Sequence, residues 1–168
     1  ISSARGSSES DEKCPMLWVA DQAGSRIDYN TNRSAFWRVT RRVLGKLTRW
    51  QQEPPDWSSH LCWTNLLKVA PADGGNPEGK LRQAQIASSV DLLAIEIAEF
   101  RPSRVLVLAG WDWFGPQFAD GLRLRIERRQ QSFVEGVATD SGCRWVVAKH
   151  PERKAEDPAV EEILAAFG

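Results

Sequence analysis

The sequence predicts an α/β fold: a single domain with three layers (α/β/α) around a mostly parallel four-stranded sheet. Short apolar runs alternate along the chain with longer segments in which apolar residues recur every three or four positions, the pattern of strands alternating with helices. At 168 residues, one domain buries most of its apolar surface without metals or disulfides. We therefore expect a flexible, Ser-rich segment over residues 1–13 and one α/β domain over residues 14–168.

The first part of the chain predicts two strands with a helix between them. Residues 16–20 form a short apolar run closed by a polar loop, which is typical of a strand. Ser34 is a suitable N-cap for a helix that begins at Ala35 and ends before the two prolines at 54–55. Residues 60–67 are rich in aromatic and apolar side chains and lead into a loop of Pro and Gly, which indicates a second strand.

The second part predicts three helices and two strands. Apolar spacing predicts a long helix over residues 79–100. The continuous apolar run at 105–109 is expected as a central parallel strand, because it suits burial on both faces. A more polar helix is expected near 116–129, a fourth strand at 145–148, and a last helix at 158–167.

Ligands of parallel α/β sheets bind beyond the carboxyl ends of the strands, which selects the loops that follow the expected strands. The polar residues in or beside those loops are Asp21, Gln22, Asn65, Lys68, Asp112, Lys149 and His150. The sequence has no G-x-G-x-x-G, Walker or G-x-S-x-G motif and no His/Cys cluster with metal-ligand spacing. The sequence therefore gives no motif evidence for the common nucleotide-binding proteins, α/β-hydrolases or metal-dependent enzymes.

Charge and cysteine content narrow the partners and the compartment. The 22 basic and 22 acidic residues cancel, although basic groups at 38–49 and 144–154 fit either phosphate contacts or a solvated face. Three cysteines without a C-x-x-C spacing favour a reducing, cytoplasmic protein with no disulfide, zinc or iron–sulfur site. No apolar run reaches the ~20 residues that span a bilayer, so no membrane partner is expected.

More specific motifs lie in the middle and late parts of the chain. Residues 64–71 (TNLLKVAP) and 75–77 (GNP) precede the long helix, whose end leads through residues 100–110 (FRPSRVLVLAG) into the apolar strand. Residues 147–151 (VAKHP) end a later strand in a His-Pro pair, and residues 34–38 (SAFWR) open the first helix. In this order the motifs resemble those of the uracil-DNA glycosylase superfamily, including its uncharacterised bacterial branch.

The resemblance, which spans residues 16–155, implies a uracil-DNA glycosylase-like fold and a DNA N-glycosylase. Such an enzyme hydrolyses the N-glycosidic bond of uracil or a related altered base after the nucleotide has been rotated out of the stack. The resemblance implies no cofactor, and single- or double-stranded DNA as the partner of a monomer. The preferred base and strand do not follow from the sequence.

By motif position, Asn65 looks like the amide that pairs with the polar edge of the base, because it supplies both a donor and an acceptor. His150 looks like the His-Pro histidine that donates a hydrogen bond to the departing base, a role that needs a donor and not a charge. The family continues with Ser and an intercalating apolar residue, whereas this chain has Glu-Arg-Lys at 152–154. The candidates for phosphate contacts are Lys68, Lys149, Arg153 and Lys154.

The first motif departs further from the family, whose first strand usually ends in Gly-x-Asp, Gly-x-Asn or Gly-x-Glu. Here the acid, Asp21, stands one place early, and Gln22 stands in its position. If Asp21 reaches the site it orients water or stabilises the sugar cation; if Gln22 occupies the place, carboxylate catalysis is lost. Phe36, or alternatively Tyr29, is the candidate for stacking on the extruded base, although Phe36 also has the spacing of a core residue.

Three functions remain open at this point. The first is a base-excising enzyme, and the second is a catalytically inactive glycosylase-like domain that binds nucleic acid. The third is an unrelated α/β domain that binds a small nucleotide or contacts proteins through Trp111 and Trp113, which lie in an expected loop.

Overall fold

The computed structural model of the chain describes residues 30–168. The flexible segment expected over residues 1–13 and the strand expected at residues 16–20 lie outside the described residues. The chain divides after Trp63 into two compact units. The expected single domain stays a prediction, and each unit has a core of its own.

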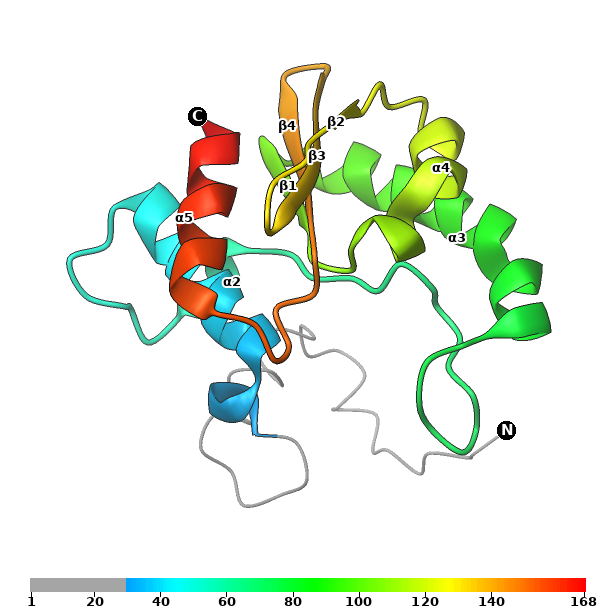
Figure 1. Cartoon of the computed structure of the whole chain (residues 1–168), viewed down its shortest axis with the longest axis horizontal. Coiled ribbons are helices and arrows are strands. Elements are labelled where there is room, and N and C mark those ends of the chain that lie inside the picture. The colour runs from blue at the N-terminus through cyan, green and yellow to red at the C-terminus, as the bar shows by residue number, and fades with distance from the viewer. Residues whose placement is uncertain (1–29) are drawn as a thin grey trace. The chain divides into compact units, whose positions relative to one another are not determined.

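The first unit contains the helix that the sequence predicts after Ser34. This helix, α2, spans Ala35–Thr48 and stands in the chain between two short 3-10 helices, η1 (Thr31–Arg33) and η2 (Trp57–His60) (Figure 1). It ends at Arg49, whose φ of 58° is the left-handed conformation common after helix C-termini.

Aromatic side chains form the core of the first unit. The ring of Trp37 lies 6.2 Å from that of Trp57 and 5.5 Å from that of Trp63, measured between centroids. The Arg41 guanidinium lies over the Trp57 ring at 5.1 Å and forms an ion pair with Glu53. One residue of the basic group at 38–49 is therefore committed to packing within its own unit.

The second unit is built on a four-stranded mixed sheet. Its strands are β1 (Arg104–Val107), β2 (Glu127–Arg128), β3 (Val134–Asp140) and β4 (Cys143–Ala148), in the order β1-β4-β3-β2. The pair β1–β4 is parallel, whereas β3–β4 and β2–β3 are antiparallel. The α/β class is confirmed, but the expectation of a mostly parallel sheet is wrong for the strands that the structure describes.

The hairpin of β3 and β4 explains this error. The two strands are joined by Ser141 and Gly142, whose φ angles of 47° and 83° are both positive. Two-residue connections of this kind match the right-handed twist of antiparallel strands, and Gly adopts a positive φ without strain. The sequence therefore contained a hairpin signal, Ser-Gly between two apolar runs, that the expectation of alternating strands and helices overlooked.

Helices cover both faces of this sheet, which gives three layers within the second unit (Figure 1). On one side lie α3 (Gly79–Phe100) and α4 (Trp111–Gly121), and on the other lies α5 (Glu156–Phe167). The predicted bounds of α3 are confirmed, and the last predicted helix begins two residues earlier than expected.

The prediction of a helix near residues 116–129 is wrong in position. The helix α4 begins directly after Gly110, so Trp111 and Trp113 belong to its first turn and not to a loop. The helix kinks at Gly115, whose φ is 37°, and ends at Gly121, after which the chain enters β2. A glycine without a Cβ tolerates that backbone angle, so the helix continues across the kink into Pro116.

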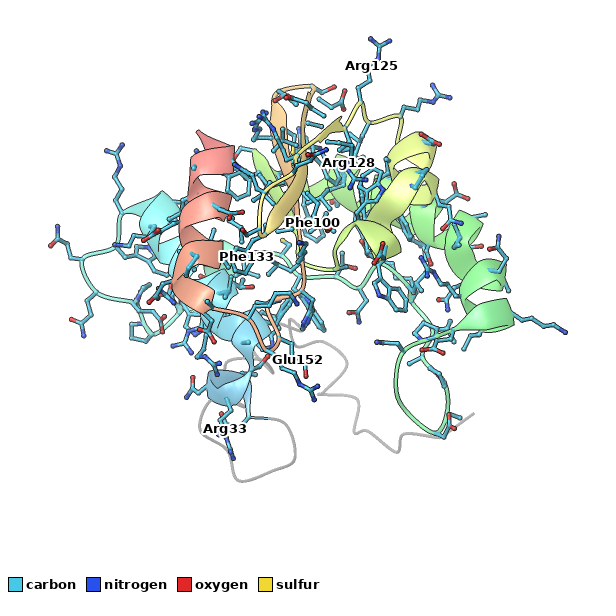
Figure 2. All side chains as sticks on the ribbon, viewed as in Figure 1. Arg33, Phe100, Arg125, Arg128, Phe133 and Glu152 are labelled. Carbon is cyan, nitrogen blue, oxygen red and sulfur yellow. The ribbon has the colours of Figure 1, made fainter. Side chains whose placement is uncertain are left out.

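The core of the second unit lies between the sheet and the pair α3 and α4. Phe114 is fully buried, stacks on Phe118 at 5.9 Å and lies 6.3 Å from the Trp145 ring. On the opposite face, the Glu162 carboxylate of α5 accepts hydrogen bonds from the backbone N–H groups of Phe133 and Val134, at 2.8 and 3.0 Å. Figure 2 shows Phe133 beside the lower turns of α5. Both faces of the sheet are thus fixed to helices.

The strand expected over residues 60–67 does not form. His60 ends η2, and residues 61–68 have no strand partner among the described residues. The segment from Thr64 to Val69 instead bonds to side chains of α3. Because those side chains take the place of a neighbouring strand, the segment is held without joining the sheet.

Candidate functional site

The candidate site lies at the carboxyl ends of β1 and β4, the one parallel pair among the described strands. The two ends are adjacent, because the Gly110 N–H after β1 donates to the Ala148 carbonyl at 2.9 Å. On the other side of β4, the Lys149 N–H donates to the Phe133 carbonyl at 2.9 Å. Loops from neighbouring strands therefore meet at one edge, which is where α/β sheets bind ligands.

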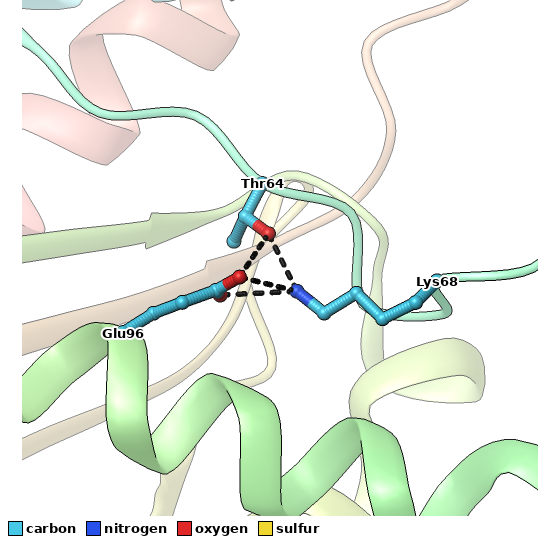
Figure 3. Close-up of polar contacts among 3 residues, drawn as sticks. All are labelled: Thr64, Lys68 and Glu96. Carbon is cyan, nitrogen blue, oxygen red and sulfur yellow. Dashed lines mark hydrogen bonds and ion pairs between the residues drawn. The ribbon is translucent and has the colours of Figure 1, made fainter. Parts of the chain in front are cut away.

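Asn65 is exposed, and its side chain makes no hydrogen bond to another described residue. Its neighbours are fixed: the Lys68 ammonium lies 3.0 Å from both carboxylate oxygens of Glu96 and 2.5 Å from the Thr64 hydroxyl (Figure 3). The Thr64 hydroxyl also lies 3.1 Å from Glu96 Oε1. The backbone around Asn65 is thus anchored, while its amide takes no part in these contacts.

A second set of contacts positions the same segment. The Gln85 amide accepts from the Val69 N–H at 2.9 Å and donates to the Val69 carbonyl at 3.0 Å, as a neighbouring strand would. Leu66 and Leu67 pack against the core cluster of the second unit. This cluster contains Val107, the last residue of β1, and Val147, the last residue but one of β4. The Asn65 segment and the edge of the sheet therefore rest on one core.

His150 follows β4, and its imidazole is held in one tautomer. Its Nδ1 accepts a hydrogen bond from the Glu152 N–H at 3.2 Å, which a protonated Nδ1 cannot do. Partial burial lowers the pKa of His150 below its ordinary value of 6.5; the Glu152 carboxylate opposes this and the Lys154 ammonium adds to it. The neutral ring carries its proton on Nε2, where it is an uncharged donor.

The candidates for phosphate contacts differ in their exposure. Lys68 is directed at Glu96, and the Lys149 ammonium donates to the Ser132 carbonyl at 2.8 Å. Arg153 has 91% of its side chain exposed and only a loose ion pair with the preceding Glu152, at 3.8 Å. Lys154 is exposed as well. The cations that face solvent beside His150 are therefore Arg153 and Lys154.

Sequence reasoning missed Glu135, which the structure brings to the same edge. Its Oε2 accepts a hydrogen bond from the Trp111 N–H at 2.7 Å, and an added Cβ on Gly110 would lie 3.4 Å from that oxygen. The Arg128 guanidinium lies over the Trp111 ring at 3.9 Å. A lone Glu in an apolar run gives no signal of such a position, because the contact joins residues 24 apart.

Three of the predicted site residues stay predictions. Asp21 and Gln22 lie outside the described residues. Phe36 belongs to the first unit, where it is half-buried, lies 4.9 Å from the Trp37 ring in an edge-on contact, and packs against the core of that unit.

Among residues 30–168, no cluster of three or more His, Cys, Asp or Glu side chains is arranged to hold a metal ion. None of the helices in this part of the chain is long and apolar enough to cross a membrane. Comparison of the chain with models of protein families, with curated proteins and with solved structures found no match.

Proposed function

We propose that this protein is a DNA base-excision glycosylase that hydrolyses the N-glycosidic bond of uracil or a related altered base. The observation that carries the proposal is His150, a neutral imidazole with its proton on Nε2, at the carboxyl edge of the parallel pair. As the base departs, negative charge develops on its oxygen and is stabilised by a hydrogen-bond donor. A neutral imidazole donates such a hydrogen bond from Nε2 and keeps its proton. A uracil-DNA glycosylase-like fold is part of the same proposal.

Asn65 supplies the second element of the proposal. Its anchored backbone and unoccupied amide suit recognition of a base edge, because recognition requires a side chain that does not have to abandon an internal bond. The exposed Arg153 and Lys154 suit contacts with the phosphates on either side of an extruded nucleotide. We expect the protein to act on single- or double-stranded DNA as a cytoplasmic monomer without a cofactor.

One observation favours a second candidate, a glycosylase-like domain that binds nucleic acid without cleaving it. The residues after His150-Pro151 are charged and exposed, so this turn has no apolar side chain to fill the stack that an extruded base vacates. Arg153 and Lys154 would then serve binding alone.

Strand-cleavage assays separate these candidates. The protein is incubated with single- and double-stranded oligonucleotides that contain uracil or another altered base, and abasic sites are cleaved with alkali. Excision by the wild type is expected, together with a loss of about 100-fold or more in Asn65→Ala and in His150→Ala. The matched controls are Asn76→Ala, another exposed loop amide, and His60→Ala, the other histidine. Intact strands across the panel with salt-sensitive binding would establish the second candidate; no binding at low salt would reject both.

A further inference from the structure

Glu135 occupies an irregular position in the sheet. The pairing of β3 with β4 shifts register between Val134 and Gly136, so Glu135 is the extra residue of a β-bulge. Bulges redirect a side chain, and this one sends the carboxylate past the end of β4 to the loop after β1, where Oε2 meets the Trp111 N–H. The carboxylate thus reaches the edge where the candidate site lies.

The bulge is fixed on its other side as well. The Glu135 carbonyl accepts hydrogen bonds from Arg128 Nε at 3.0 Å and from the Arg129 N–H at 2.9 Å. The Arg128 guanidinium in turn stacks on Trp111, the residue whose N–H the Glu135 carboxylate binds. Backbone and side chain of Glu135 are therefore held by three residues, Trp111, Arg128 and Arg129.

Capping the N-terminus of α4 explains only part of this arrangement. One oxygen is enough for the Trp111 N–H, and α4 already carries Asp112 in its first turn. Oε1 of Glu135 makes no hydrogen bond to another described residue, although the side chain is half-buried. Gly110 has a φ of 78° and no Cβ, so the backbone leaves the carboxylate room at this edge. A half-buried, oriented carboxylate with one oxygen unused is suited to meet a positive charge.

We propose that Glu135 is the carboxylate that stabilises the positively charged sugar during base excision, an inference that rests on the proposed function. In the reaction, the bond between the sugar C1′ and the base nitrogen breaks, and its electron pair leaves with the base. The oxygen of a water molecule then bonds to C1′, and the proton which that water loses ends on the base. Glu135 remains ionised throughout and lowers the energy of the sugar cation by its charge.

Binding of abasic-site analogues tests this inference without requiring turnover. Two oligonucleotides are compared by fluorescence anisotropy, one with a cationic pyrrolidine in place of the sugar and one with a neutral tetrahydrofuran. The wild type is expected to bind the cationic analogue about tenfold more tightly. Glu135→Gln keeps an oxygen for the Trp111 N–H but loses the charge, so its preference should fall to about onefold. Glu127→Gln, which removes an exposed carboxylate from the neighbouring strand β2, should keep the wild-type preference.

The inference is overturned if the wild type shows no preference or if Glu135→Gln retains it. Glu135→Asp guards against a misfolded Gln variant: it keeps the charge but withdraws it by one methylene, so an intermediate preference is expected and an unchanged one counts against the inference. Excision assays on the same proteins separate the two proposals. A preference that depends on Glu135 in a protein that excises nothing would keep Glu135 as the group that binds a cationic sugar, but it would remove the proposed function and with it the role of Glu135 in excision. Excision without a preference that depends on Glu135 would support the proposed function and overturn the role of Glu135. A protein that binds no DNA would overturn both proposals.

Discussion

Removing the Glu96 carboxylate tests whether the Thr64, Lys68 and Glu96 network holds the Asn65 segment in place. In Glu96→Ala, the Lys68 ammonium loses two contacts of 3.0 Å and keeps, among residues 30–168, only the Thr64 hydroxyl as a partner. The side chains of Lys68 and Glu96 are 21% and 32% exposed, so water replaces the lost carboxylate only in part. The variant therefore leaves an incompletely solvated charge beside the core.

The expected cost follows from this exposure. Losing the partner of a charged hydrogen-bonding group costs roughly 1.5–3 kcal/mol, and partial exposure places this case near 2 kcal/mol. Unfolding entropy of ~2.1 cal/mol/K per residue over about 105 residues converts this to a fall in Tm of about 9 °C. The two units unfold together or separately, so the transition to follow is the one that exposes Trp145, buried in the second unit.

A double-mutant cycle separates the ion pair from other effects of the substitutions. Lys68→Met, Glu96→Gln and the double variant are unfolded in urea, and a coupling free energy of about 1–2 kcal/mol is expected. The control cycle uses Glu152 and Arg153, which are 3.8 Å apart with side chains 67% and 91% exposed, and its coupling should be near zero. Equal coupling in both cycles would refute the reasoning that the network anchors this segment.

Three further predictions concern individual side chains. An NMR titration should give His150 a pKa below 6.5, because burial disfavours the charged ring. The unfolded chain then binds its proton first, so stability falls as the pH drops from 6.5 through the pKa of the folded state. A pKa at or above 6.5 would refute this prediction. In a Cys14→Ser background at pH 8, the exposed Cys62 should react with a thiol reagent at least about tenfold faster than the buried Cys143. The pKa of Cys143 is raised by burial and, to a smaller extent, by the Asp140 charge, so less of its thiol is ionised. Equal rates would refute this. Gly110→Ala should lower the free energy of unfolding in urea by about 1–3 kcal/mol, because its φ of 78° and ψ of 166° lie in a region that only glycine adopts without strain. A loss of less than about 0.5 kcal/mol would refute this.

The long helix α3 was predictable because its signals are local. Residues 79–100 repeat apolar side chains at helical spacing and end at Arg101-Pro102, and α3 has these bounds. The strand at 60–67 was not predictable in the same way. Its composition suits a strand, but whether such a run joins a sheet depends on a partner, and here Gln85 and Glu96 of α3 take that place.

Some features of the candidate site are likewise local in the sequence, and others depend on distant residues. Asn65 lies near the end of one expected strand and His150 lies after another, a pattern that marks both in the sequence. The tautomer of His150 depends on a backbone N–H two residues away, and Lys68 turns toward an acid 28 residues away, so the engagement of each follows only from the fold. Residue type shows which hydrogen bonds and charges a side chain offers. The fold decides whether neighbouring residues already use them.

The corrected topology explains how Glu135 reaches the site. In a fully parallel sheet, every strand ends at the edge where ligands bind, so only residues at strand ends reach it. Because β3 runs antiparallel to β4, its first residues lie beside the end of β4, with Val134 opposite Ala148. Glu135, near the beginning of β3, therefore lies at the same edge as His150. A search confined to residues that follow the expected strands excludes Glu135, because no strand was expected over residues 134–140. The wrong prediction of a mostly parallel sheet and the missed carboxylate therefore have one cause, the overlooked hairpin of β3 and β4.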